Sequence, residues 1–293
     1  MKKKKDGFDK DLTRFPGDAG NPMAPLLEAL GIRAGGAGGL QQPADAANEL
    51  VYEALELEDD EEAFTLVQSA LLLDPGCILA YEYLAECEIM PTLSIPHYAW
   101  GVQLGRRLFG GKYLKENKGQ FWGLVETRPF MRCLYGYGRN CYYLGRREES
   151  ISCYQELIEL NPTDNQGVRY ELGAHLLEAG DSEGYAQLRG RYPHERGALF
   201  AWSDALHAFR AGGESPAADE LLKAAVAANP HVAKHLLAKD LPEDLPDSYK
   251  LGSNDEALYY ASFAWVAWQG TPGATGWLRK RKPAAKAKKK GGE

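Results

Sequence analysis

The sequence predicts an all-α protein in which helical hairpins stack into a superhelical array, an α-solenoid. From Ala44 onward, apolar residues recur at three- and four-residue spacing, and the alternation typical of strands is scarce. Two pairs of glycines, Gly138 with Gly173 and Gly145 with Gly180, are each separated by 35 residues. This period suits a two-helix unit of ~34 residues, and because one hairpin cannot bury its own apolar face, the units must stack.

Two segments carry the repeat most clearly, residues 131–162 and residues 199–230, and both end in Asn-Pro. Small residues where the two helices meet allow a close approach, and bulky residues fill the groove beside them. The order of these residues resembles the tetratricopeptide repeat, which runs from a bulky residue through Leu-Gly and Tyr to Ala, Phe, Ala and Pro. The positions that carry the resemblance, expected to be structural, are Leu134, Gly138, Tyr154, Pro162, Trp202, Ala218 and Pro230.

Three further segments resemble weaker units of the same repeat: residues 44–75, 78–107 and 166–192. The second of them contains the sequence MPTLSIP, whose two prolines we expect to lie in a loop between helices. The stretches ETRPFMR and NPTDNQGVRY look like blocks of uncharacterised bacterial tetratricopeptide proteins. NPHVAKHLL and the following DEALYYASFAWVAW are similar to the C-terminal part of the suppressor-of-tumorigenicity family, which implies a helical terminal cap.

These patterns divide the chain into four parts. Residues 1–42 and 279–293 carry too few apolar side chains to offset the entropy of ordering, so both are expected to be disordered. The repeats are expected over residues 43–254 and the cap over residues 255–278. No apolar run reaches the ~18 residues that span a bilayer, and no secretory signal follows Met1, which favours a cytoplasmic protein. The five cysteines form no CxxC pair and are expected to be buried, reduced thiols.

Charge is unevenly distributed along the chain. The formal net charge is −7, but residues 1–14 hold six basic and three acidic side chains, and residues 279–293 hold eight basic and one acidic. Residues 15–278 therefore carry a net charge of −17. An acidic body repels nucleic acid, so any such contact, expected to be weak, would come through the Lys-rich C-terminal tail. That tail is equally compatible with a solvated segment of no function, and in a eukaryote with a nuclear signal.

Nothing in the sequence indicates catalysis, a cofactor or a metal site. His231 and His235 are four residues apart, but Val232 stands where a zinc protease has its catalytic glutamate. The stretch GGAGG is typical of a linker, and neither a phosphate-binding loop nor a G-x-S-x-G elbow occurs. We therefore expect a protein that is not an enzyme.

The candidate functional surface is the face of the first helix of each unit, which lines the concave groove in tetratricopeptide arrays. Arginines and tyrosines fall at three- and four-residue spacing there. The predicted partner-binding residues are Arg132, Tyr135, Arg139, Tyr142, Asn165 and Arg169. We expect this groove to bind a segment of another protein, carrying carboxylates that the arginines would receive. The alternative is that Arg132 and Arg139 pair with Glu126, Glu171 or Glu178 of the chain itself.

The predicted function is accordingly that of a scaffold or adaptor for protein partners. Two rival hypotheses remain open at this point. The first is a nucleic-acid-associated protein that uses its basic tails, and the second is the accessory subunit of an enzyme or a catalytic domain without a recognisable motif.

Overall fold

The computed structural model describes residues 41–242, 245, 246 and 248–281, and all regular secondary structure within these ranges is helical. The all-α, helical-repeat fold predicted from the sequence is therefore confirmed. The chain folds into two compact units, whose described residues are 41–116 with 126–133 (unit 1) and 117–125 with 134–281 (unit 2). None of the helices in the described ranges is long and apolar enough to cross a membrane.

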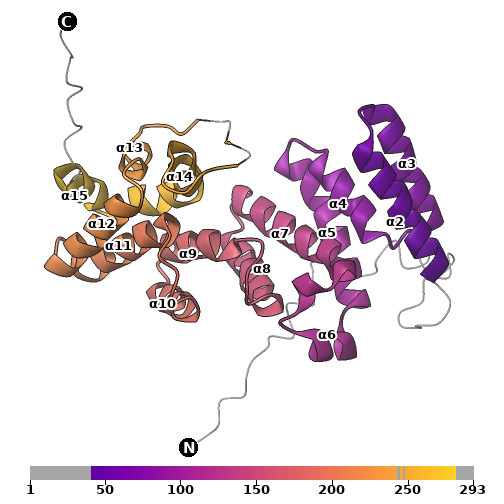
Figure 1. Ribbon diagram of the computed structural model, residues 1–293, viewed down its shortest axis with the longest axis horizontal. Helices are drawn as coiled ribbons and strands as arrows, with labels where there is room; N and C mark the ends of the chain where they lie inside the picture. The colour runs from indigo at the N-terminus through magenta and orange to yellow at the C-terminus, as the bar shows by residue number, and fades with distance from the viewer. Residues whose placement is uncertain (1–40, 243–244, 247, 282–293) are drawn as a thin grey trace, which may run out of the picture. The chain divides into compact units, whose positions relative to one another are not determined.

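Unit 1 is built from two hairpins and a short following helix (Figure 1). The first hairpin pairs α2 (Gln41–Glu56) with α3 (Asp60–Leu73), and the second pairs α4 (Ile78–Glu86) with α5 (Pro91–Leu108). Helix α6 (Gly111–Asn117) follows, and the first residues of α7 (Arg128–Tyr143) complete the unit. Small side chains let α2 and α3 pack closely, and the buried ones are Ala47, Val51, Ala54, Ala63, Val67 and Ala70.

The two prolines of MPTLSIP lie in a helix, so their predicted loop position was wrong. Pro91 is the first residue of α5 and Pro96 lies inside it. Met90 precedes the helix in extended conformation, which a residue before proline prefers, and the first helical position needs no N–H donor. Pro96 removes one backbone hydrogen bond near the start of a long helix that packing maintains, since Tyr98 and Val102 are buried.

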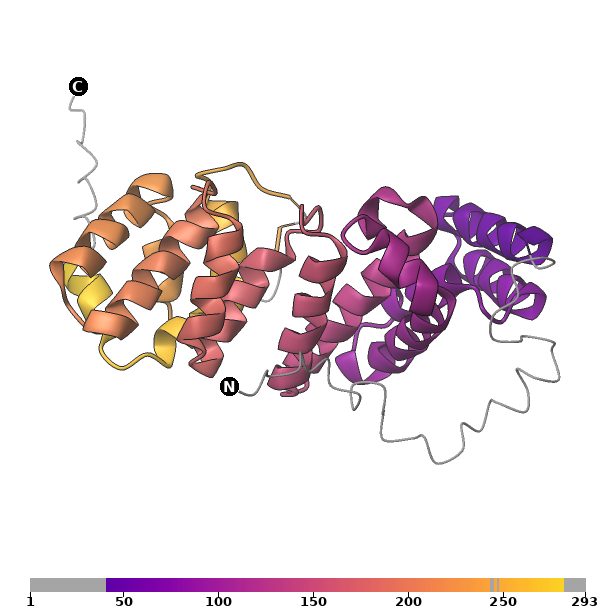
Figure 2. The ribbon, with the colours of Figure 1, turned by 90° about the horizontal axis from the view of Figure 1, so that it is seen from below.

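Unit 2 contains the remainder of α7, and helices α7 to α12 follow one another in it as successive hairpins (Figure 2). Its short 3-10 helix is Phe121–Gly123, and a second 3-10 turn, Val125–Thr127, spans the boundary between the units. The pairs are α7 with α8 (Arg147–Leu160), α9 (Val168–Ala179) with α10 (Ser182–Arg191), and α11 (Ala198–Gly212) with α12 (Pro216–Ala228). The remaining helices are α13 (Val232–Leu236), α14 (Asn254–Gln269) and α15 (Ala274–Arg281).

The glycines with the 35-residue spacing have two different structural roles. A Cβ on Gly138 would lie 2.9 Å from the Tyr154 ring and 3.0 Å from Cys153 Cβ, so α7 and α8 touch at this glycine. Gly173 faces the ring of Tyr185 in the same way, at 3.3 Å. Gly145 and Gly180 follow α7 and α9 with φ of +78° and +81°, a left-handed conformation that terminates helices and suits glycine. The 35-residue spacing therefore reflects one close contact between the two helices and one helix end in each hairpin.

The structural positions predicted from the repeat lie where a packed hairpin requires them. Leu134, Tyr154, Trp202 and Ala218 are all fully buried. Pro162 and Pro230 each follow an asparagine that ends a helix, and Asn229, which precedes Pro230, is in extended conformation.

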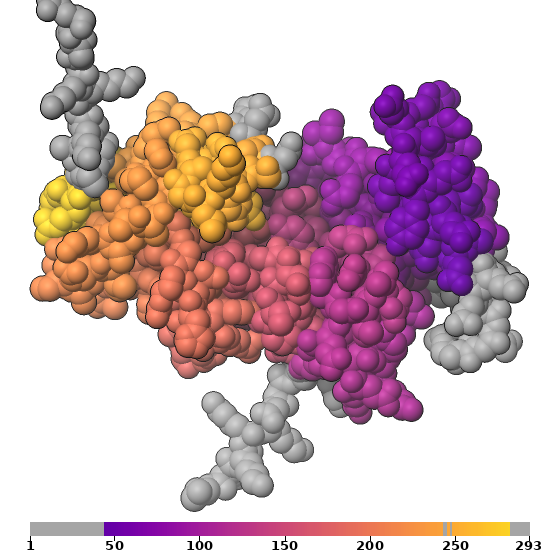
Figure 3. Space-filling model, in the orientation of Figure 1, coloured from indigo at the N-terminus to yellow at the C-terminus, as the bar shows by residue number. Residues whose placement is uncertain are grey.

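The C-terminal helices pack back onto the hairpins of unit 2. Helix α14 lies against α13 and α9 and also touches α11 (Figure 1). In the space-filling view the yellow-orange side chains of α14 form part of the surface of unit 2 (Figure 3). Three tryptophans join these elements, because Trp268 of α14 contacts the rings of both Trp202 and Trp277. The predicted cap is thus two helices, and one of them crosses onto α9.

Helix α15 extends beyond the predicted end of the cap at residue 278. Residues 279–281, assigned from the sequence to the disordered tail, form its last turn. Lys280 pairs with Glu214 at 2.6 Å and Arg281 pairs with Asp219 at 3.0 Å, so carboxylates of unit 2 hold this basic turn. Residues 1–40 and 282–293, the bulk of both predicted tails, lie outside the described residues. The cysteines are free, and all are buried except the exposed Cys87.

Candidate partner-binding faces

The predicted groove residues divide between the two units. Arg132 belongs to unit 1, whereas Tyr135, Arg139, Tyr142 and Arg169 belong to unit 2, as does Asn165. Each unit is therefore considered separately, beginning with the only one of these residues that lies in unit 1.

Arg132 binds a carboxylate of its own unit. Its Nη2 donates to Glu82 Oε2 of α4 at 2.9 Å, and its Nε donates to the other carboxylate oxygen, which makes the pair bidentate. Burial raises the pKa of Glu82, and the hydrogen bonds and positive charge of Arg132 only partly oppose that rise. The sequence predicted pairing with Glu126, Glu171 or Glu178 as the alternative to a groove role, and the partner is a fourth glutamate.

Beside this pair, α2 presents an apolar surface that the sequence prediction missed. Tyr52 is 51% exposed and Leu55 is 58% exposed. Tyr52 lies within electrostatic range of Arg132, so it is near the Arg132–Glu82 pair. Helical spacing sets the exposed Glu49 and Glu56 beside these two residues. We call this surface, made by Tyr52, Leu55, Glu49, Glu56, Glu82 and Arg132, the Tyr52 face.

The Tyr52 face lies in the most one-sided charge segment of the described chain. Residues 41–105 contain thirteen Asp and Glu residues and neither lysine nor arginine. Exposed carboxylates at such density repel one another and attract cations over roughly a Debye length, about 10 Å at 0.1 M salt. This acidic segment can be found in the sequence, but a comparison of only the tails with the whole body does not separate it.

In unit 2, Tyr135 and its neighbours form a buried network around one carboxylate. Tyr135 and Tyr154 donate to the two oxygens of Glu171 at 2.7 Å and 2.9 Å. Burial, and then the negative charge of Glu171, raise the pKa of Tyr259 of α14, which lies near this carboxylate. Burial raises the pKa of Glu171, against the lowering effect of the tyrosines and the positive charge of Arg139. Arg139 itself lies over the Tyr135 ring, 5.8 Å from its centroid. These residues join α7, α8, α9 and α14.

Tyr142 packs into a second cluster of the same unit. Its ring stacks on His175 of α9 at 3.9 Å between centroids, and its hydroxyl donates to Glu178 at 2.5 Å. Arg147 covers the other side of the cluster, 3.7 Å from the Tyr142 ring centroid and 3.0 Å from Glu178. Burial and the charge of Arg147 lower the pKa of His175 to about 3, and its Nδ1 has no hydrogen-bond partner in the described residues. Tyr142 is therefore held inside unit 2.

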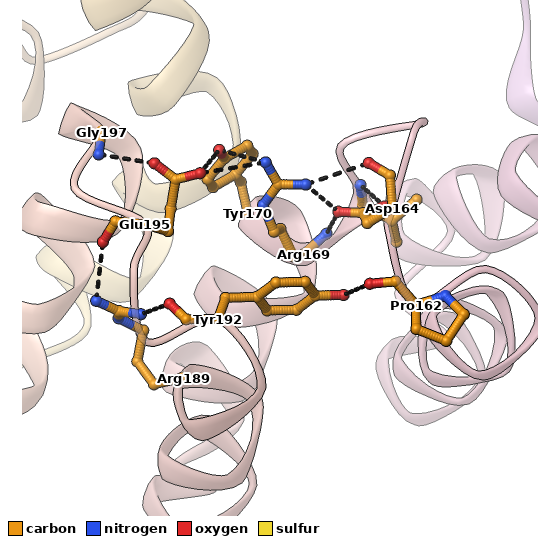
Figure 4. A network of polar contacts seen from close by, with 9 residues as sticks. Pro162, Asp164, Arg169, Tyr170, Arg189, Tyr192, Glu195 and Gly197 are labelled. Atoms are coloured by element: carbon orange, nitrogen blue, oxygen red, sulfur yellow. Dashed lines mark hydrogen bonds and ion pairs between the residues drawn. The ribbon is translucent and has the colours of Figure 1, made fainter. Parts of the chain in front are cut away.

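Arg169 is the centre of a third network, drawn in Figure 4. It donates to Asp164 at 2.9 Å, to the Tyr170 hydroxyl at 2.7 Å and to Glu195 at 3.3 Å. Asp164 also accepts the backbone N–H groups of Val168 and Arg169, so it caps the start of α9. Asn165 is exposed, and its side-chain oxygen accepts a hydrogen bond from the hydroxyl of Thr163. Arg169 thus fixes the loops at either end of the α9–α10 hairpin.

The face of α9 is closed because other helices surround it. Helices α8, α10, α11 and α14 all pack against α9. Even its polar residues Glu171 and His175 are buried. The structure thus brings Tyr135, Arg139 and Tyr142 together on α7 around α9, places Arg169 at the start of α9, and leaves Arg132 in unit 1.

No cluster of three or more potential metal ligands occurs among the described residues. His235 hydrogen-bonds to Asn254 at 2.9 Å, and His231 begins α13.

Comparison with known proteins gives one family match. A search of curated proteins finds no match. A family model for the tetratricopeptide repeat matches residues 131–164, the segment of α7, α8 and the following loop. This is the unit whose glycine contact and helix ends are described above, and proteins with such repeats generally serve as scaffolds for protein interaction. The chain therefore contains a tetratricopeptide repeat, and its α7–α8 hairpin is that repeat.

Proposed function

We propose that the protein is an adaptor that binds a basic, apolar segment of another protein on the Tyr52 face of unit 1. The observation that carries this proposal is the pairing of two exposed apolar side chains, Tyr52 and Leu55, with a surrounding chain segment that has thirteen acidic and no basic residues. Aromatic and aliphatic side chains supply contact area, while the carboxylates select the sign of the partner's charge.

A basic partner agrees better with the described contacts than the acidic one predicted from the sequence. Two of the three arginines that were expected to receive carboxylates already hold one, because Arg132 pairs with Glu82 and Arg169 pairs with Asp164. An acidic segment would have to displace a carboxylate and leave it unpaired, which costs free energy. A basic segment would meet Glu49 and Glu56 without breaking either pair.

The role proposed is binding and not catalysis. The buried tyrosine and glutamate clusters of unit 2 hold helices together, and their hydrogen bonds are made within the unit. We propose, in the same sense, that the protein acts without a cofactor.

The proposal is tested by selecting peptides from a random library on the full chain. Enriched peptides should combine lysine or arginine with aromatic or aliphatic residues. Their affinity should fall with salt, by about tenfold if three or four exposed pairs contribute ~0.2–1 kcal/mol each. Enrichment of acidic peptides would contradict the proposal.

Two variants locate the binding site of the selected peptide. Tyr52→Ser with Leu55→Ser should abolish binding. Leu72→Ser is the matched control, because Leu72 is 85% exposed on α3 of the same unit and lies outside the Tyr52 face. Equal loss of binding in both would show that the peptide recognises exposed apolar residues in general.

A further inference from the structure

We infer that residues 2–15 of the chain itself dock on the Tyr52 face and compete there with the partner segment. This inference rests on the proposed function for the nature of the ligand, but it names a particular occupant. Its basis is the match between the chemistry of the face and that of the N-terminal sequence.

The first element of the match is charge. Residues 1–14 contain Lys2 to Lys5, Lys10 and Arg14 against three aspartates. They precede a segment of 65 residues, 41–105, that holds thirteen acidic and no basic side chains. The two opposite charge excesses are thus neighbours in the chain, and their attraction is strongest at low salt.

The second element is the spacing of apolar residues. Phe8, Leu12 and Phe15 are separated by four and three residues, so a helix formed by this segment would carry all three on one side. Tyr52 and Leu55 are separated by three residues on α2 and are both exposed. A basic amphipathic segment is the kind of ligand that lays its apolar side on such a surface.

The third element is reach. Twenty-five residues, 16–40, connect Phe15 to the start of α2, and they include the run AGGAGG at residues 34–39. At 3.3–3.6 Å per residue, a chain of this length can extend to roughly 80–90 Å at most. Helix α2, with 16 residues, is about 24 Å long. The connecting residues are therefore long enough for residues 2–15 to reach the Tyr52 face, and a tether of this kind gives an effective concentration on the order of millimolar.

The C-terminal tail is a poorer occupant, although it is also basic. Residues 282–293 contain Pro, Ala, Gly and Lys with one Glu, and no aromatic or large aliphatic residue. The tail leaves unit 2 after α15, whose last turn is already paired with Glu214 and Asp219. It offers charge without the apolar side chains that Tyr52 and Leu55 require.

Carbodiimide cross-linking of the full chain tests this inference, because the reagent joins an amine and a carboxylate that are in contact. At ~50 mM salt, monomeric protein should contain links from Lys2 to Lys5 or Lys10 to Glu49 or Glu56, and 1 M salt should remove them. Links from the C-terminal lysines to this face, links found only in dimers, or no links at all would each overturn the inference.

A pair of triple variants separates apolar recognition from charge alone. Phe8→Ser, Leu12→Ser and Phe15→Ser together should reduce the cross-link yield severalfold while leaving every lysine in place. The matched control changes three apolar residues of the connecting segment, Leu26→Ser, Leu27→Ser and Leu30→Ser, and should leave the yield unchanged. An equal decrease in both would contradict docking through Phe8, Leu12 and Phe15.

A titration distinguishes failure of this inference from failure of the proposed function. The probe is a fluorescent synthetic peptide of residues 2–15, added to the full chain and to a chain with Lys2 to Lys5 changed to glutamate. The peptide should bind the variant severalfold more tightly, because its own segment no longer competes. Equal affinities would refute docking in the intact chain and leave the proposed function standing. If library selection yields acidic peptides while the cross-links form, docking stands and the proposed function fails.

Discussion

Two helices that each begin a hairpin differ in what surrounds them. In unit 1, α2 carries two exposed apolar residues, Tyr52 and Leu55. In unit 2, α9 is surrounded by four other helices. The difference arises from α14, which packs onto α9 and brings Tyr259 near the Glu171 carboxylate. Similar hairpins therefore have two outcomes: in unit 2 a later part of the chain covers the helix, and in unit 1 the helix keeps an exposed side, to which we assign the proposed binding.

The largest effect expected is from removal of Trp202. Its indole N–H donates to the carbonyl of Asn229 at 3.2 Å and its ring meets Trp268 of α14. Trp202→Ala should cost about 3–5 kcal/mol in the free energy of unfolding. Hydrogen exchange should accelerate in α9 and α14 and remain unchanged in α2 and α3. An unchanged melting temperature would show that α14 does not depend on this contact.

The second prediction concerns pH and the cover over α9. The pKa of His175 is lowered to about 3 in the folded state, while an exposed histidine has a pKa near 6.5. Between these values the unfolded chain binds the extra proton, so folding stability is lost as pH falls, by up to ~1.4 kcal/mol per pH unit. His175→Phe should remove that contribution. Denaturation at pH 7 and pH 5 checks it: parallel losses in both proteins would contradict a buried, neutral His175.

The third prediction tests the close contact within the matched repeat. Gly138→Ala places a methyl group 2.9 Å from the Tyr154 ring and should cost about 1–3 kcal/mol. The matched control is Gly190→Ala in α10, where a Cβ meets nothing within 4 Å. That change should be neutral or stabilise by up to ~1 kcal/mol. Equal effects on urea denaturation would mean that α7 and α8 are not in close contact at Gly138.

The smallest effect is expected on the Tyr52 face. Tyr52→Ser with Leu55→Ser should change stability by no more than about 0.5 kcal/mol for each residue, because exposed residues away from packing contribute little. The free energy of unfolding should therefore fall far less in this double variant than in Trp202→Ala. A loss as large as that of Trp202→Ala would show that Tyr52 and Leu55 belong to the core of unit 1.

The hairpins were predictable because their signals are local. Gly138, Gly145 and Pro162 lie within one unit and report its contact and its ends. The cover over α9 was not predictable, because Glu171 and Tyr259 are far apart in the sequence and α9 shows little amphipathic contrast. Arg132 and Tyr142 were recognised as a surface pattern, but their partners Glu82 and Glu178 come from other helices. Spacing along one helix indicates which residues share a side and does not identify what covers that side.

The most direct test of the central claim is hydrogen–deuterium exchange of the full chain with and without a selected basic peptide. We expect slower exchange in α2 and α4 on peptide binding, with α9 and α14 unchanged. Protection of α9, or displacement of α14 seen as faster exchange over Asn254–Gln269, would contradict it, since the partner would then occupy the helix that unit 2 covers.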